Sequence, residues 1–219
     1  MTDIQKLYAN RFIDTGLEKR KRVWKALCEQ FFDPLIDADG TVLDLGCGYG
    51  EFINNVRCRH KIAVDVNPDA AAHLHSDVRF FRTRVTDLSA IGADSIDTVF
   101  TSNMLEHLTS KQECSDVMRE AWRILKPHGQ FILLGPNIKY AYREYWDFYD
   151  HHLPLSDLSI AEGLRQSGFA ALRVVPRFLP YTMNSTLPTA DFLVRLYLST
   201  PFAWRLFGKQ FLVIAKKQC

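Results

Sequence analysis

Residues 42–50 read Val-Leu-Asp-Leu-Gly-Cys-Gly-Tyr-Gly, and this stretch decides the fold. The apolar residues before Gly46 predict a buried strand over 41–45. Gly46, Gly48 and Gly50 then allow the backbone to approach a ligand where a side chain would clash. A helix is expected after the turn, with its free N–H groups and positive dipole end facing the same ligand. Nucleotide-binding folds of many kinds use such turns, so the glycines alone do not identify the ligand.

Outward from this turn, short apolar runs alternate with helical segments. Strands are predicted over 41–45, 61–66, 78–82, 95–101, 130–134, 170–175 and 210–216. Helices are predicted over 4–36, 68–75, 110–126 and 156–167. This alternation predicts a parallel sheet with helices on both faces. Ligands of such sheets bind at the carboxyl ends of the strands, near the point where the strand order reverses, so the loops after the first four strands are expected to line one crevice.

Acidic residues lie at the ends of three successive predicted strands. Asp44 ends the first strand, Asp65 lies at the end of the second, and Asp87 follows the third. A carboxylate at Asp65 can accept hydrogen bonds from both hydroxyls of a ribose. Asp87 can reach an adenine amino group, with Leu88 packed on the ring. Three acids in register with a glycine turn therefore indicate a ligand that contains a nucleoside.

At these residues the sequence resembles the class I S-adenosylmethionine-dependent methyltransferases, over about residues 40–175 and the last strand. The family's acid-x-Gly-x-Gly-x-Gly motif falls on 44–50, its fourth-strand motif on 96–108, and its Leu-Lys-Pro-x-Gly segment on 125–129. The resemblance implies a Rossmann-like, doubly wound seven-stranded sheet with a reversed last strand, in three α/β/α layers. It implies S-adenosylmethionine as the cofactor. The residues expected to bind it are Asp44, Gly46, Cys47, Gly48, Gly50, Asp65, Val66, Asp87, Leu88 and Asn103.

Three histidines are candidates for a catalytic base. Methyl transfer from a sulfonium is an in-line displacement that depends mainly on orientation, but an oxygen acceptor often also needs a base. His107 follows the fourth strand, and His151 and His152 lie in the loop after the fifth. An architectural role is the alternative for each, because similar histidines are common in relatives with different chemistry. Asp147 and Asp150 could join the paired histidines around a metal, but adjacent histidines point in different directions, so no metal is expected.

The chain is expected to form a single methyltransferase domain over 1–219. Helices in 1–37 precede a core of 41–176 and 210–217. The residues in 178–209 form an apolar, aromatic insertion that is far longer than a usual connection. This insertion is expected to be a lid over the site or a dimer surface, and a segment lying on a membrane is the alternative.

The composition of the chain limits the classes of molecule that it is expected to bind. Lysine and arginine number 27 against 25 acidic residues, a net charge of +2 that argues against a nucleic-acid binder. The five cysteines include no CxxC pair, which fits a reducing cytoplasm. No signal peptide or long apolar run is apparent, so no stable membrane insertion is expected. Aromatic residues crowd 140–149, and aromatic faces suit a sugar ring or an aromatic metabolite. The expected acceptor is a small molecule, methylated on a hydroxyl oxygen, and a homodimer is a possible assembly.

Two alternatives stay open. A nicotinamide-dependent Rossmann oxidoreductase would use Gly-x-Gly-x-x-Gly, but here the third glycine comes one residue early and Glu51 follows it. A protein that binds the cofactor without methyl transfer is the second alternative.

Overall fold

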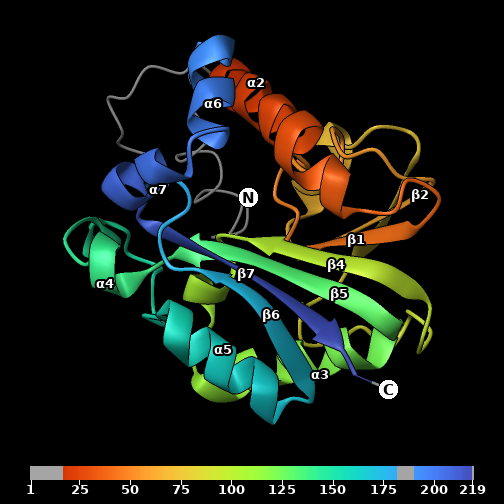
Figure 1. Ribbon diagram of the computed structural model, residues 1–219. Coiled ribbons are helices and arrows are strands. Elements are labelled where there is room, and N and C mark those ends of the chain that lie inside the picture. The colour runs from red at the N-terminus through yellow and green to blue at the C-terminus, as the bar shows by residue number, and fades with distance from the viewer. Residues whose placement is uncertain (1–16, 182–189, 219) are drawn as a thin grey trace.

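The protein folds around a seven-stranded sheet with the strand order β3-β2-β1-β4-β5-β7-β6 (Figure 1). The computed structural model describes residues 17–181 and 190–218, so the predicted helix before residue 17 and part of the predicted insertion lie outside the described residues. The strands are β1 (Thr41–Leu45), β2 (His60–Asp65), β3 (Val78–Arg82), β4 (Ile96–Ser102), β5 (Leu125–Pro136), β6 (Phe169–Val175) and β7 (Gln210–Lys217). Because β7 runs antiparallel to β5 and β6 while the other pairs are parallel, the predicted reversed last strand is confirmed.

Helices cover both faces of the sheet, which gives the three predicted layers. The α-helices are α2 (Leu17–Leu27), α3 (Lys111–Ile124), α4 (Ile138–Ala141), α5 (Asp157–Gln166), α6 (Asp191–Leu198) and α7 (Pro201–Phe207). α3 and α5 lie on one face, and α2 and α6 lie on the other (Figure 1). Under α2, the rings of Phe52 and Phe100 stack with centroids 3.6 Å apart, and Phe32 meets both edge-on. Buried aromatic surface of this kind anchors the N-terminal helix to the sheet.

The connections on the β1–β3 side are less regular than predicted. Residues 50–56 form consecutive turns without a regular helix, so the helix expected after the glycine turn is wrong. The side chains of Asn54 and Asn55 donate to the backbone carbonyls of His73 and Glu51, both at 2.8 Å. Such side-chain bonds compete with helix formation. After β2 the chain forms a single 3₁₀ segment, η3 (Pro68–His73).

The local sequence signals predict the N-terminal end of α3 correctly but place its C-terminal end too late. Ser110 caps the helix by accepting from the Glu113 N–H at 3.2 Å. The Glu113 carboxylate accepts from the Thr109 N–H at 2.8 Å, so the predicted capping box forms in half. The helix ends at Ile124, and β5 begins at Leu125, which pairs with β4. Sheet pairing therefore ended the helix before its predicted Pro-His-Gly stop.

The insertion before β7 is partly helical and packs on the N-terminal helices. Arg195 of α6 forms a 2.6 Å ion pair with Glu29, which lies in the π-helix η1 (Cys28–Phe32). Trp204 of α7 packs edge-on against Phe31 and Phe178. The outer faces of α6 and α7 expose large apolar side chains, namely Phe192, Leu196, Phe202, Leu206 and Phe207. Among the described residues, no helix is long and apolar enough to cross a membrane.

Candidate functional site

The strand order reverses between β1 and β4, and the loops after these two strands meet. A Cβ atom at Gly46 would lie 2.5 Å from the Cγ atom of Met104, so the glycine turn packs directly against the segment after β4. Ligands of open α/β sheets bind at such a reversal point. The loops after β1 and β4 therefore meet at Gly46 and Met104, where the sequence predicts the ligand to bind.

The glycine turn depends on backbone conformations that favour glycine. Gly46, Gly48 and Gly50 have φ values of 76°, 56° and 76°. A Cβ atom at Gly50 would also lie 2.5 Å from a methyl carbon of Leu74. The turn is fixed to β2, because the N–H groups of Gly46 and Cys47 both donate to the Val64 carbonyl, at 2.8 and 3.0 Å. Positive φ explains all three glycines, and lack of space is a second reason at Gly46 and Gly50.

Three buried carboxylates surround this turn. Asp44, Glu51 and Asp65 are each less than a tenth exposed. Burial, followed by the charges of Glu51 and Asp65, raises the pKa of Asp44 well above its usual range. Arg20 of α2 forms an ion pair with Glu51. Glu51 was not among the predicted site residues, and its position directly after Gly50 was the available signal. A cationic ligand at this turn would lower the energetic cost of ionising the buried carboxylates.

Asp65 shapes the turn as well as the predicted ribose site. One of its carboxylate oxygens accepts from the Gly48 N–H at 2.9 Å, and the other accepts from the Asn67 N–H at 2.8 Å. Carboxylate oxygens have further lone pairs for ribose hydroxyls. Val66, the next predicted contact, is exposed at the end of β2. The two residues thus present a carboxylate and an apolar side chain at the same strand end.

The remaining predicted cofactor residues divide into exposed and buried ones. Asp87 is exposed, and its hydrogen bonds to Ser89 lower its pKa. Asn103 is also exposed and has a φ of 49°, with its N–H bonded to the Leu134 carbonyl. Cys47 and Leu88 are buried. Leu88 has no exposed surface and belongs to the core under α3, and its contact with an adenine ring stays a prediction. A side chain as apolar as leucine is more stable when buried in the core than at a surface site.

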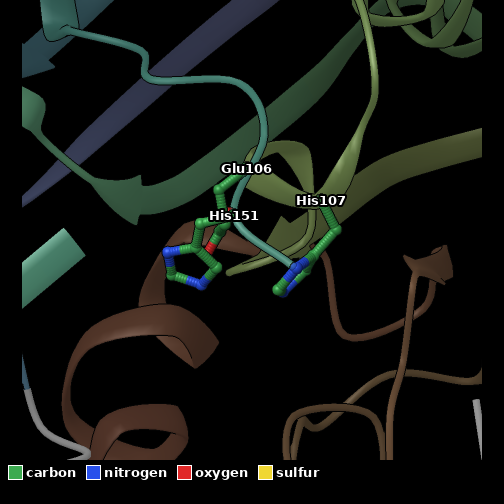
Figure 2. Close-up of side chains that lie close together, drawn as sticks. All are labelled: Glu106, His107 and His151. Atoms are coloured by element: carbon green, nitrogen blue, oxygen red, sulfur yellow. The ribbon is translucent and has the colours of Figure 1, made fainter. Parts of the chain in front are cut away.

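A second group of side chains converges from the loops after β4 and β5. Glu106 and His107 lie in the 3₁₀ segment η4 (Leu105–His107), and His151 lies in the loop before α5. Each offers a ligand atom within 4.8 Å of the other two (Figure 2). Glu106 and His151 are buried, whereas the His107 side chain is 28% exposed. The sequence singled out the two histidines but not the nearby carboxylate.

Asp150 orients His107. The Nδ1 atom of His107 lies 3.0 Å from the Asp150 carboxylate and 3.1 Å from its backbone carbonyl. Both partners are acceptors, so Nδ1 donates and Nε2 remains the acceptor nitrogen. Burial by itself lowers the pKa of His107, but the hydrogen bond to Asp150 and the charge of Glu106 raise it above its usual range. His107 is therefore fixed in one orientation and one tautomer.

His151 and His152 have different surroundings. His151 stacks on Phe148 with ring centroids 4.7 Å apart and packs against Tyr145 at the same distance. His152 is exposed, and its backbone N–H donates to the Glu106 carbonyl at 2.8 Å. The backbone at His152 therefore joins the two loops while its side chain points to the surface. The structure brings His107 and His151 together and leaves the His152 side chain apart.

A hollow of about 280 Å³ lies at the opposite end of the sheet, between the first residues of β4 and β5. Asp97 and Lys126 line it and form an ion pair at 2.7 Å. It lies away from the glycine turn and the histidines, so it is not part of the candidate site.

A family comparison covers the donor side of this site. Residues 43–133 match the family described as "Methyltransferase domain". The match runs from β1 into β5 and includes the glycine turn, Asp65, Asp87 and His107. No curated protein matches the sequence.

Solved structures share the fold at low sequence identity. One is a candidate methyltransferase in complex with the Haloferax volcanii Trm112 methyltransferase activator, with 17% identity and a TM-score of 0.72 over 97% of this chain and 98% of the other. A SAM-dependent methyltransferase from Archaeoglobus fulgidus has 18% identity and a TM-score of 0.68 over 90% and 94%. The cyclase SpnF has 17% identity and a TM-score of 0.63 over 90% and 80%. At these identities the likeness shows the fold.

Because this fold also carries a cyclase, the family match rather than the fold decides the activity. The matched domain includes the acid-x-Gly-x-Gly-x-Gly turn, and the nicotinamide alternative has no support in the match. Residues 43–133 form a methyltransferase domain, its cofactor is S-adenosylmethionine, and the chain is similar to the class I S-adenosylmethionine-dependent methyltransferases.

Proposed function

We propose that this methyltransferase transfers the methyl group to a hydroxyl oxygen of a small molecule, such as a sugar unit or a secondary metabolite. The observation that carries the proposal is the cluster of Glu106, His107 and His151, which the Met104 segment connects to the glycine turn. A neutral hydroxyl is a weak nucleophile, so groups that promote loss of its proton favour an oxygen acceptor. The oxygen–carbon bond forms as the carbon–sulfur bond breaks, and the hydroxyl proton is released.

The charge at the donor side supports this chemistry. The methyl donor carries a positive sulfonium, and the product is a neutral thioether. Buried carboxylates at Asp44, Glu51 and Asp65 favour the cation, which promotes donor binding and product release. Raising the population of the bound, oriented donor supports an in-line displacement.

Aromatic side chains at the acceptor side support a ring-shaped acceptor. The exposed aromatic residues of this segment are Tyr140, Tyr142, Trp146 and Tyr149. The chain around the insertion contacts the same segment, because the Arg177 guanidinium lies 4.8 Å from the Tyr140 ring centroid and Lys209 pairs with Glu144. These contacts favour the insertion as a cover of the acceptor over a dimer or membrane surface. Tyrosine and tryptophan faces suit sugars and aromatic metabolites.

Transfer of an isotopically labelled methyl group tests the acceptor class. The enzyme is incubated with labelled S-adenosylmethionine and with separate metabolite, protein and nucleic-acid fractions. We expect label in the metabolite fraction, and we expect it to resist alkaline hydrolysis, since a methyl ether does and a methyl ester does not. Label confined to protein or nucleic acid contradicts the proposal. A parallel calorimetric titration with S-adenosylhomocysteine checks that the protein binds the cofactor product.

Three variants distinguish the roles of the three histidines. His107→Ala and His151→Ala should each lower turnover at least tenfold while the affinity for S-adenosylhomocysteine stays within twofold, because these side chains lie at the acceptor side. His152→Ala should leave both quantities nearly unchanged, since its side chain is exposed. If His152→Ala alone slows turnover, the assignment of the acceptor side is incorrect.

A further inference from the structure

We propose that Glu106, His107 and His151 bind a divalent transition-metal ion of the zinc class. The metal site stands on its own geometry, and its use in catalysis rests on the proposed hydroxyl acceptor. This inference reverses the expectation from the sequence that no metal is bound. It also uses a different ligand set, since the sequence suggested Asp147 and the paired histidines as the alternative.

The donor set fits such an ion. Two imidazoles and one carboxylate form a ligand set that zinc enzymes use, with a fourth position left open. The three ligand atoms lie within 4.8 Å of one another. Metal–nitrogen and metal–oxygen bonds are about 2.0–2.2 Å, so two ligands of one ion lie up to roughly 4 Å apart. Small side-chain movements therefore close the three groups around an ion, and Figure 2 shows them converging from two loops.

The residues that contact the two histidine ligands support the same assignment. Metal-bound histidines generally donate their second ring N–H to a carboxylate or a carbonyl, which fixes the tautomer. His107 does so through Nδ1, to both the carboxylate and the carbonyl of Asp150. The ring of His151 is held between Phe148 and Tyr145. The site is therefore organised before any ion enters.

Burial gives the site a closed side and an open side. Glu106 and His151 are 3% and 7% exposed, whereas the His107 side chain is 28% exposed. The open side gives an ion a route in and leaves a position for an exchangeable ligand. Tyr145, which packs on His151, is fully buried, and its hydroxyl has no hydrogen-bond partner among the described residues. A water molecule bound to the ion can accept from that hydroxyl, which removes the penalty of an unpaired buried donor.

In this position an ion would activate the acceptor. A hydroxyl oxygen that replaces the exchangeable ligand becomes more acidic and releases its proton to solvent. The oxygen then forms its bond to the methyl carbon while the carbon–sulfur bond breaks, and the neutral thioether leaves. The ion keeps its oxidation state throughout, so no oxidant or reductant is needed.

Cobalt(II) provides the direct test, because it replaces zinc and gives visible ligand-field bands. The full-length protein is treated with a chelator, dialysed, and titrated with cobalt(II) and then with zinc(II). We expect saturation at one equivalent and loss of the bands when zinc is added. Glu106→Gln keeps the side-chain shape, and His151→Phe keeps an aromatic ring between Phe148 and Tyr145. Each should weaken cobalt binding at least tenfold, whereas His75→Ala, which removes an exposed histidine elsewhere, should not.

The result that overturns the metal site is the absence of stoichiometric cobalt bands in the natural chain, or equal cobalt affinity in natural chain, Glu106→Gln and His151→Phe. Circular dichroism shows whether each variant is folded. The absence of cobalt bands is measured on the natural chain alone, so that outcome does not depend on how the variants fold. Failure of the two proposals can be told apart. Full methyl transfer after chelation, without cobalt bands, removes the metal site and leaves the hydroxyl acceptor in place. Stoichiometric cobalt binding without label in any small molecule does the opposite.

Discussion

The glycine turn after β1 and the cluster after β4 and β5 form the two halves of the candidate site, and they are built differently. The turn consists of consecutive residues whose backbone conformations and buried acids define the donor site. The cluster combines side chains from segments 43 residues apart, such as His107 and Asp150. The donor half is therefore a property of local sequence, and the acceptor half depends on how the loops pack.

Gly46→Ala should have the largest effect on stability and cofactor affinity, because it strains the backbone of the donor half. The added Cβ atom would lie 2.5 Å from Met104 Cγ, at a φ of 76°. Strain of this kind costs roughly 1–3 kcal/mol. We expect a lower melting temperature and a loss of S-adenosylhomocysteine affinity of more than tenfold, measured by calorimetry. Gly92→Ala is the control, since its Cβ atom would meet nothing closer than Ser95 Oγ at 3.9 Å. Equal effects of the two variants would contradict the role of the turn.

Asp65→Ala tests whether the donor half also needs its side chains. The substitution removes the acceptors of the Gly48 and Asn67 N–H groups as well as the predicted ribose contact. An unpaired buried donor costs about 1–3 kcal/mol, so we expect a tenfold or greater loss of cofactor affinity. Asp77→Ala is the control, because it removes a carboxylate that pairs with Lys61 at the other end of the β2–β3 strand pair. Unchanged affinity in Asp65→Ala refutes the assignment.

Asp150→Asn tests the acceptor half without touching the turn. Asparagine keeps a hydrogen-bond acceptor for His107 Nδ1 but removes the charge. Loss of such an orienting partner lowers activity about 10–100-fold in comparable sites. We expect turnover to fall at least tenfold while S-adenosylhomocysteine affinity is unchanged. Asp147→Asn, a change at an exposed acid of the same segment, should affect neither quantity. A loss of cofactor affinity in Asp150→Asn would mean that the two halves are coupled.

Asp44→Asn should have the smallest effect and should separate stability from function. The pKa of Asp44 is raised in the folded protein by burial and by Glu51 and Asp65. The folded state therefore holds this proton more tightly than the unfolded state, and stability falls as the pH rises above about 4. The variant should be more stable than the natural chain at neutral pH, and the difference should shrink towards pH 4 in denaturant titrations.

The same variant should weaken binding of the cationic donor more than binding of the neutral product. Asp39→Asn, which changes an exposed acid, is the control for both measurements. An equal loss for donor and product would show that Asp44 acts through packing rather than charge.

The strands were predictable because each is a short apolar run, and the predicted bounds agree closely with β1, β3 and β6. The errors have specific causes. The helix after the glycine turn was lost to side-chain bonds from Asn54 and Asn55. α3 ended early because Leu125 pairs with β4. The contact of Leu88 with the cofactor stays a prediction, and its apolar side chain belongs to the core. For α3 and for Leu88, a contact distant in sequence outweighed a local signal.

The sequence by itself determined the donor half, because three glycines at alternate positions after an apolar strand predict the positive φ values that the turn adopts. It also determined the sheet and its reversed last strand. Only the tertiary structure decided which two histidines lie together, that Asp150 orients His107, and that Glu106 lies close to both imidazoles. Side-chain chemistry of this kind depends on distances between loops, and those distances are set by the packing of β4, β5 and α5, not by the spacing of residues along the chain.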